Sequence, residues 1–147
     1  MITNVTEYKE AVKRRDAEKT QIEEYRKQLK DQNISEEMVA KAIQPYESFR
    51  LQLVEEIDDY ERIKRGVIND IYNLAAIGQR LIGIRIFLGL SQRELAQKLG
   101  VHETQISRDE RNEYHGITAA QVQEILSALG VNMKSSFEIP AQVRSRL

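Results

Sequence analysis

A run of polar side chains ends the stretch LSQRELAQKLGVHETQISRDE, residues 90–110. If Val101 and Ile106 point into a core, their polar neighbours lie on or beside the exposed face of a helix. These neighbours are Glu103, Thr104, Gln105, Ser107 and Arg108. Side chains of these types can read base edges in the major groove of DNA, where glutamine pairs with adenine and arginine with guanine. The stretch therefore predicts a helix that recognises bases.

Two short helices joined by a sharp turn must position these side chains. Ser91 suits the N-cap of the first helix, and the small Ala96 lets a second helix cross closely over it. Gly100 can take the left-handed conformation that ends a helix and turns the chain. The spacing predicts a helix-turn-helix over 91–111. Gln92 opens the first helix, where a side chain and free backbone N–H groups suit a phosphate.

The same segment resembles the DNA-binding domains of the lambda-repressor/Cro type, often called the XRE family. The matching residues are QRELAQKLGV at 92–101 and QISRDE at 105–110, and the likeness extends over roughly 75–132. The resemblance implies a regulator that binds double-stranded DNA, with the second helix of the motif facing bases. It also implies an ion pair between Arg85 and Glu110, a structural role. The residues that it places at DNA phosphates are Ser91, Gln92, Arg111 and Asn112.

Two features depart from that family's pattern. Asp109 stands where the family usually has an apolar or aromatic residue. The family also commonly has glycine soon after the glutamate, whereas here the run RNEYHG brings Gly116 late. We therefore expect a longer turn after the recognition helix, and we expect Asp109 to join Arg85 and Glu110.

The whole chain predicts an all-α protein. It has 147 residues, with only 7 glycines and 2 prolines, and it is rich in good helix formers. We expect one helix over 6–31 with Thr6 as its N-cap, and a second long helix starting at Pro45, because proline fits the first turn. Together they would form a hairpin over 1–66 that serves as a dimerisation or partner-binding arm. A linker over 67–74 and helices near 75–88, 91–98, 102–112 and 118–129 would follow.

The C-terminal segment 133–147 predicts a tail with a short β-strand. Met133, Phe137 and Ile139 alternate in the way that a strand requires. A lone strand needs a partner, which a second subunit could supply by symmetry. Either this strand or the hairpin, whose seam carries several tyrosines, could therefore form the interface of a homodimer.

Several classes of function find no support in the sequence. There is no cysteine, and the two histidines, His102 and His115, lack the spacing of metal ligands. No nucleophile elbow, P-loop or GxGxxG occurs, so we expect no enzyme, no cofactor and no metal. No apolar run approaches the ~18 residues of a membrane span, and we expect a cytoplasmic protein.

Net charge gives no sign of a polybasic tail. Residues 1–74 carry 13 Lys/Arg against 16 Asp/Glu, and residues 75–147 carry 9 against 7. Any contact with nucleic acid must then come from the local placement of cations.

Two functions remain open at this point. The first is a sequence-specific transcriptional repressor that binds a palindromic operator as a dimer. The second follows from another likeness: an EY near the start, a charged hairpin ending in DDYERIKRG and the motif look like antitoxins of type II toxin–antitoxin pairs. In that alternative the N-terminal helices bind and neutralise a toxin, and DNA binding serves autoregulation.

Overall fold

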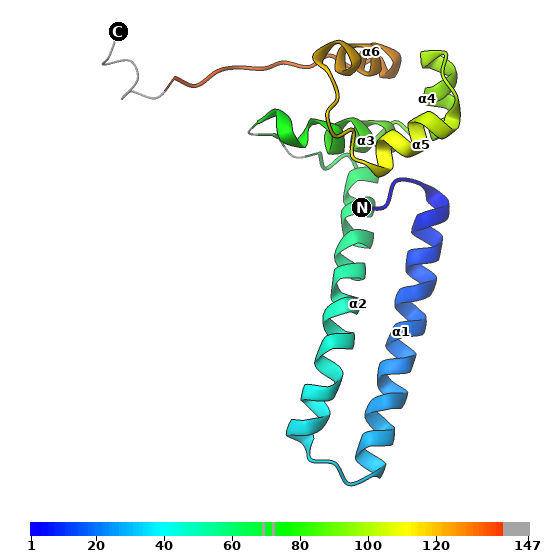
Figure 1. Ribbon diagram of the computed structural model, residues 1–147, viewed down its shortest axis with the longest axis vertical. Helices are drawn as coiled ribbons and strands as arrows, with labels where there is room; N and C mark the ends of the chain where they lie inside the picture. Colours follow the sequence, from blue (N-terminus) through cyan, green and yellow to red (C-terminus); the bar gives the residue numbers. More distant parts are fainter. Residues whose placement is uncertain (69, 72, 140–147) are drawn as a thin grey trace.

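A long helical hairpin carries a compact head of shorter helices at its open end (Figure 1). The computed structural model describes residues 1–68, 70–71 and 73–139, and all regular structure within them is helical. The hairpin consists of α1 (Val5–Asp31) and α2 (Glu36–Lys64). The head consists of the 3₁₀ helix η1 (Leu74–Ala76), α3 (Ile77–Phe87), α4 (Gln92–Leu99), α5 (Glu103–Arg111) and α6 (Ala119–Leu129). The prediction of an all-α protein is confirmed, and the helices of the head begin and end within two residues of their predicted bounds.

Asn4, rather than Thr6, caps α1. The Asn4 side-chain oxygen accepts the Glu7 N–H at 2.9 Å. The Glu7 carboxylate reaches back to accept the Thr3 N–H at 2.8 Å. Asparagine and threonine are both good N-caps, and the sequence alone did not separate them. The predicted cap was therefore wrong by two residues.

Helix α2 begins nine residues before Pro45, so the predicted start at that proline was wrong. Its N-cap is Ser35, whose hydroxyl accepts the Met38 N–H at 3.4 Å. Val39 and Ile43 are buried against Ile22 of α1. A proline inside a helix removes one backbone hydrogen bond, and this packing holds the turns before Pro45 in the helix in spite of that loss.

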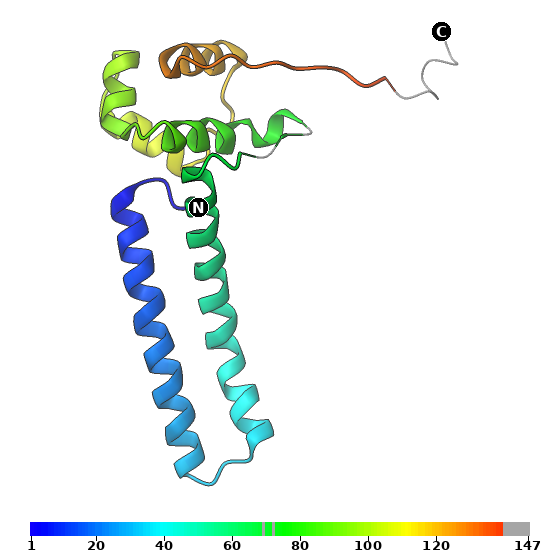
Figure 2. The ribbon, with the colours of Figure 1, turned by 180° about the vertical axis from the view of Figure 1, so that it is seen from behind.

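The hairpin is packed at its two ends. Near the connecting turn lies the small cluster of Ile22, Val39 and Ile43. At the open end Tyr8 stacks on Tyr60 with 4.9 Å between ring centroids. The view from behind shows the two helices side by side along their whole length (Figure 2). A two-helix layer of this kind buries only one stripe of each helix, so much of its surface stays exposed.

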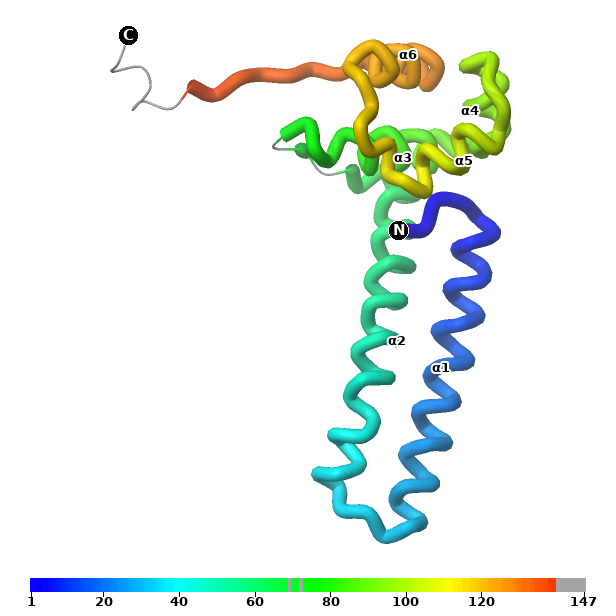
Figure 3. The backbone as a smooth tube through the Cα atoms, viewed as in Figure 1, coloured from blue at the N-terminus to red at the C-terminus, as the bar shows by residue number. Residues whose placement is uncertain are grey.

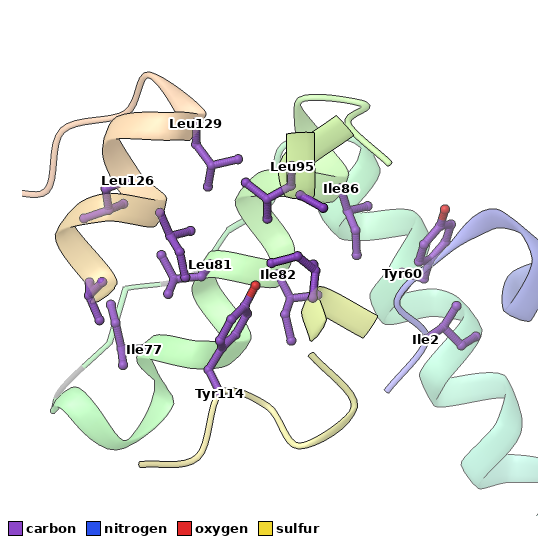
Figure 4. Close-up of a cluster of buried hydrophobic side chains, with 14 of the residues drawn as sticks. Ile2, Tyr60, Ile77, Leu81, Ile82, Ile86, Leu95, Tyr114, Leu126 and Leu129 are labelled. Carbon is purple, nitrogen blue, oxygen red and sulfur yellow. The ribbon is translucent and has the colours of Figure 1, made fainter. Parts of the chain in front are cut away.

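The head and the open end of the hairpin share one hydrophobic core (Figure 4). Ile82, in α3, is completely buried at the centre of this core. Ile2 and Tyr60 approach it from the hairpin side, so the N-terminal segment and α2 both help to close it. The residues that the figure labels in the head are Ile77, Leu81, Ile82, Ile86, Leu95, Tyr114, Leu126 and Leu129. Because the core is continuous, the hairpin fixes the position of the helices in the head.

The predicted C-terminal strand does not form in residues 133–139. After α6 the chain runs away from the head without regular structure, as the backbone tube shows (Figure 3). Phe137 is 94% exposed. A strand needs a neighbour for its backbone groups, and the described part of the chain supplies none. The rest of that prediction, 140–147, lies outside the described residues.

No single helix in the described residues is long and apolar enough to cross a membrane. Residues Leu74–Phe87 and Gln92–Leu99 reach the necessary length and composition only when taken together, and they meet at 107°.

Candidate nucleic-acid interface

Helix α4 begins with a reciprocal capping box. The Ser91 hydroxyl oxygen accepts the Glu94 N–H at 3.1 Å, and the Glu94 carboxylate accepts the Ser91 N–H and hydroxyl, both at 2.7 Å. These donors lower the pKa of the Glu94 carboxyl, the backbone N–H of Ser91 most. Ser91, a predicted phosphate contact, thus uses its hydroxyl to start the helix, and its side chain remains at the surface.

A tight turn follows α4. Gly100 adopts φ +68°, which glycine reaches without the cost that a side chain brings. The Val101 N–H then bonds to the Ala96 carbonyl at 3.0 Å. The chain reverses and enters α5, so that α4 and α5 meet at an angle around the turn (Figure 3). The predicted helix-turn-helix is present.

The outward face of α5 is the candidate reading surface. Ile106 and Glu110 are buried on the inward side of this helix. The Arg108 side chain is 77% exposed, with its Nε 3.7 Å from an Asp109 oxygen. Of the other predicted base readers, Glu103, Thr104 and Gln105 are exposed and Ser107 is half-buried. The five predicted base readers are thus brought together on one short helix.

Arg85 of α3 and Glu110 of α5 form the ion pair that the resemblance implied. Arg85 Nη2 donates to Glu110 Oε2 at 2.6 Å, and Arg85 Nε donates to the other carboxylate oxygen. Arg85 Nη1 also donates to the Leu90 carbonyl at 2.7 Å. The expectation that Asp109 joins this cluster was wrong, because the cation beside Asp109 is Arg108 on the surface.

The Gln92 amide faces inward. Its Nε2 donates to Glu110 at 2.8 Å and lies 3.5 Å from the Thr3 hydroxyl oxygen. The Thr3 carbonyl in turn accepts Arg85 Nη2 at 2.7 Å. Sequence reasoning missed Thr3, since nothing in the spacing of the motif points to a residue 82 positions before Arg85.

The turn after α5 is long, as predicted. Glu113 and Tyr114 both have positive φ, +51° and +53°, an uncommon conformation for residues with side chains. A Cβ at Gly78 of α3 would lie 1.9 Å from the Glu113 carbonyl oxygen. Only glycine at position 78 therefore allows α3 to approach this turn. Arg111 and Asn112, the remaining predicted phosphate contacts, are exposed where α5 ends.

Two of the four acidic groups of α4 and α5 have close hydrogen-bond partners within the protein. Glu94 belongs to the capping box, and Glu110 is paired with Arg85. Four cations lie on the outside of the motif: Arg93, Lys98, Arg108 and Arg111 are exposed. The surface can therefore attract phosphates although the chain as a whole carries a formal net charge of −1. Among the described residues no three His, Asp or Glu side chains are arranged to hold a metal ion.

Comparison with known families agrees with this geometry. A family model described as helix-turn-helix matches residues 84–134, which contain the last four residues of α3 and all of α4, α5 and α6. Comparison with curated proteins and with solved structures gives no match.

Proposed function

We propose that this chain, whose residues 84–134 match a helix-turn-helix family model, is a sequence-specific DNA-binding transcriptional repressor of the XRE, lambda-repressor-like type. The observation that carries the proposal is the outward face of α5. Glu103, Thr104, Gln105 and Arg108 are exposed on this face, while Ile106 and Glu110 anchor the helix in the core. A rigid helix with an open polar face is suited to the major groove.

The polar side chains of the motif would have two roles, contact with bases and contact with phosphates. Glu103, Thr104, Gln105, Ser107 and Arg108 would face base edges. Arg108 would form the strongest specific contact, two hydrogen bonds to guanine. Ser91, Gln92, Arg111 and Asn112 would meet phosphates, with Ser91 and Gln92 contributing backbone N–H groups at the N-terminus of α4.

A dimer is part of the proposal. One α5 can read only a few base pairs, which is too little for a unique site. Two copies related by a two-fold axis would place two α5 helices about 34 Å apart on a palindrome. Bound across a promoter, such a dimer would exclude the polymerase and so repress transcription.

Selection of duplexes from a random-sequence library by the full chain tests this proposal. We expect a palindrome with half-site centres about 10 base pairs apart, or a multiple of one helical turn. The Arg108→Ala variant should select the same palindrome with one position relaxed. Recovery of unrelated sequences by the wild-type chain would overturn the proposal.

One feature favours a second function, that of an antitoxin. An apolar groove lies along the hairpin, lined by Glu18, Gln21, Ile22, Tyr25, Tyr46 and Phe49. Arg14 lies 4.8 Å above the half-exposed Phe49 ring. A groove that combines apolar rings with charge suits a protein partner, and a toxin would be that partner.

Co-expression with the product of the neighbouring reading frame tests the antitoxin function. If that product arrests growth, co-expression of the wild-type chain or of Arg108→Ala should restore growth. Co-expression of Phe49→Lys should leave growth arrested. Neutralisation that survives Phe49→Lys would exclude the groove as the contact.

A further inference from the structure

We propose that Thr3 is a positioning residue for DNA binding, through which the hairpin holds both helices of the motif in their reading geometry. The inference rests on the proposed function. It assigns a role to the segment before α1, which lies outside the residues that the family model matches.

Thr3 lies at the meeting point of three elements. It is buried, with 7% of its surface exposed. Its carbonyl accepts Arg85 Nη2 of α3 at 2.7 Å, and its hydroxyl oxygen lies 3.5 Å from Gln92 Nε2 of α4. Its N–H and hydroxyl donate to the Glu7 carboxylate of α1 at 2.8 and 2.9 Å.

The Thr3 carbonyl completes the environment of a buried cation. The Arg85 guanidinium also donates to Glu110 and to the Leu90 carbonyl. A buried charge is costly unless its hydrogen bonds are satisfied. Thr3 therefore helps to hold Arg85 in the orientation that fixes Glu110, the residue before the last of α5.

The Thr3 hydroxyl contacts α4. Gln92 is the first residue of α4, at the position proposed to meet a phosphate. Its amide is held between Glu110 and Thr3. Thr3 is thus linked to α4 directly and to α5 through Arg85 and Gln92, and Thr3 itself is fixed by the first turn of α1.

The consequence is mechanical coupling between the hairpin and the DNA-binding surface. Thr3 is followed directly by the N-cap of α1, Asn4. A displacement of the start of α1 would move Thr3 and would be transmitted to Gln92 and Arg85 together.

Substitution of Thr3 tests the role. Thr3→Val removes the hydroxyl, keeps the side-chain shape and leaves the carbonyl in place, so the fold should persist. With the duplex that the wild-type chain selects, we expect Thr3→Val to raise the Kd about three- to tenfold, the size of one or two hydrogen bonds. The log–log salt slope should not change, because no cation is lost. Thr3→Ser should restore wild-type affinity.

A matched control and a double-mutant cycle separate positioning from general stability. Thr6→Val makes the same chemical change at an exposed residue three positions later and should bind like wild type. On a Gln92→Ala background, Thr3→Val should add little further loss, because the two side chains act together. Independent, additive losses, or a Thr3→Val variant that binds as tightly as wild type or more tightly, would overturn the inference.

The proposed function and this inference fail in different ways. If the wild-type chain shows no preference for any duplex, the proposed function fails. If it selects a duplex and the Thr3 variants follow Thr6→Val, only the positioning role fails.

Discussion

The Arg85 guanidinium and the Glu110 carboxylate, 25 residues apart in the sequence, face each other with 3% and 0% of their side chains exposed. Their pairing joins α3 to the end of α5. A buried ion pair is tolerated when every donor and acceptor is satisfied. Here the Thr3 and Leu90 carbonyls and the Gln92 amide supply the remaining bonds. Helix α5 is therefore fixed by charge as well as by the apolar contact of Ile106.

Removal of one member of this pair should be strongly destabilising. We expect Glu110→Ala to lower the free energy of unfolding by about 3–5 kcal/mol, because Arg85 is left buried without its counter-charge. The double variant Arg85→Met with Glu110→Leu should recover much of that loss. Chemical denaturation followed by circular dichroism measures both. A loss below about 1 kcal/mol for Glu110→Ala, the range of an exposed ion pair, would show that the pair is not buried in solution.

Substitution of Arg108 and substitution of Arg111 should weaken DNA binding in different ways. Arg108→Ala should cost about 1–3 kcal/mol of binding free energy and relax the preference at one base pair. Arg111→Ala should weaken binding to all sequences alike and reduce the salt slope by about one unit. Titrations of the selected duplex and its single-base variants at several salt concentrations distinguish the two. Loss of specificity in Arg111→Ala with an unaffected Arg108→Ala would reverse the assigned roles.

The capping box of α4 should make the stability of the folded state depend on pH under acidic conditions. Hydrogen bonds from Ser91 lower the pKa of Glu94 below the usual value of a glutamate. The ionised form therefore stabilises the folded state above the unfolded-state pKa of about 4.3, and this contribution is lost as the pH falls.

Glu94→Gln isolates this contribution. Glutamine can keep the box, as Gln121 does in the equivalent box at the start of α6, but it does not titrate. We expect the Tm of Glu94→Gln to change less than that of wild type between about pH 6 and pH 3. Equal acid sensitivity of the two proteins would assign the effect to other carboxylates.

Replacement of Tyr114 by phenylalanine should make the folded protein more stable. Its ring is buried, and its hydroxyl has no hydrogen-bond partner among the described residues. Burial, and then the charge of Glu110, raise the pKa of this phenol. The neutral form is therefore required by the fold, and stability is lost as the pH rises above the unfolded-state value of about 10.

We expect Tyr114→Phe to raise the free energy of unfolding by about 1 kcal/mol at neutral pH. It should also reduce the loss of stability under alkaline conditions. Thermal unfolding at neutral and at alkaline pH measures both effects. A less stable Tyr114→Phe variant would mean that the hydroxyl has a partner in solution.

The motif was predictable because each local signal in it points to the same structure. Ser91, Ala96 and Gly100 predict a capped helix, a small residue packed inward and a turn; the cap and the turn are found, and Ala96 is buried. The start of α2 was not predictable in this way. Pro45 is a strong local signal for a helix start, but the packing of Val39 and Ile43 on Ile22 outweighs it.

No local signal in the sequence indicates the contacts of Thr3. The Thr3 carbonyl is a main-chain group, so the residue type at position 3 does not reveal its contact with Arg85. The prediction of a C-terminal strand was wrong for a different reason. A period of two shows only that a segment can form a strand, and pairing needs a neighbour that the sequence does not specify.

Sequence-specific recognition by α5 is tested most directly by a salt titration of binding to the selected duplex and to a scrambled duplex of the same composition. We expect a much tighter complex with the selected duplex, and a log–log slope of several units at ~0.9 per phosphate contact. Arg108→Ala should bring the two affinities closer together. Equal affinity of the wild-type chain for both duplexes would contradict sequence-specific recognition by α5.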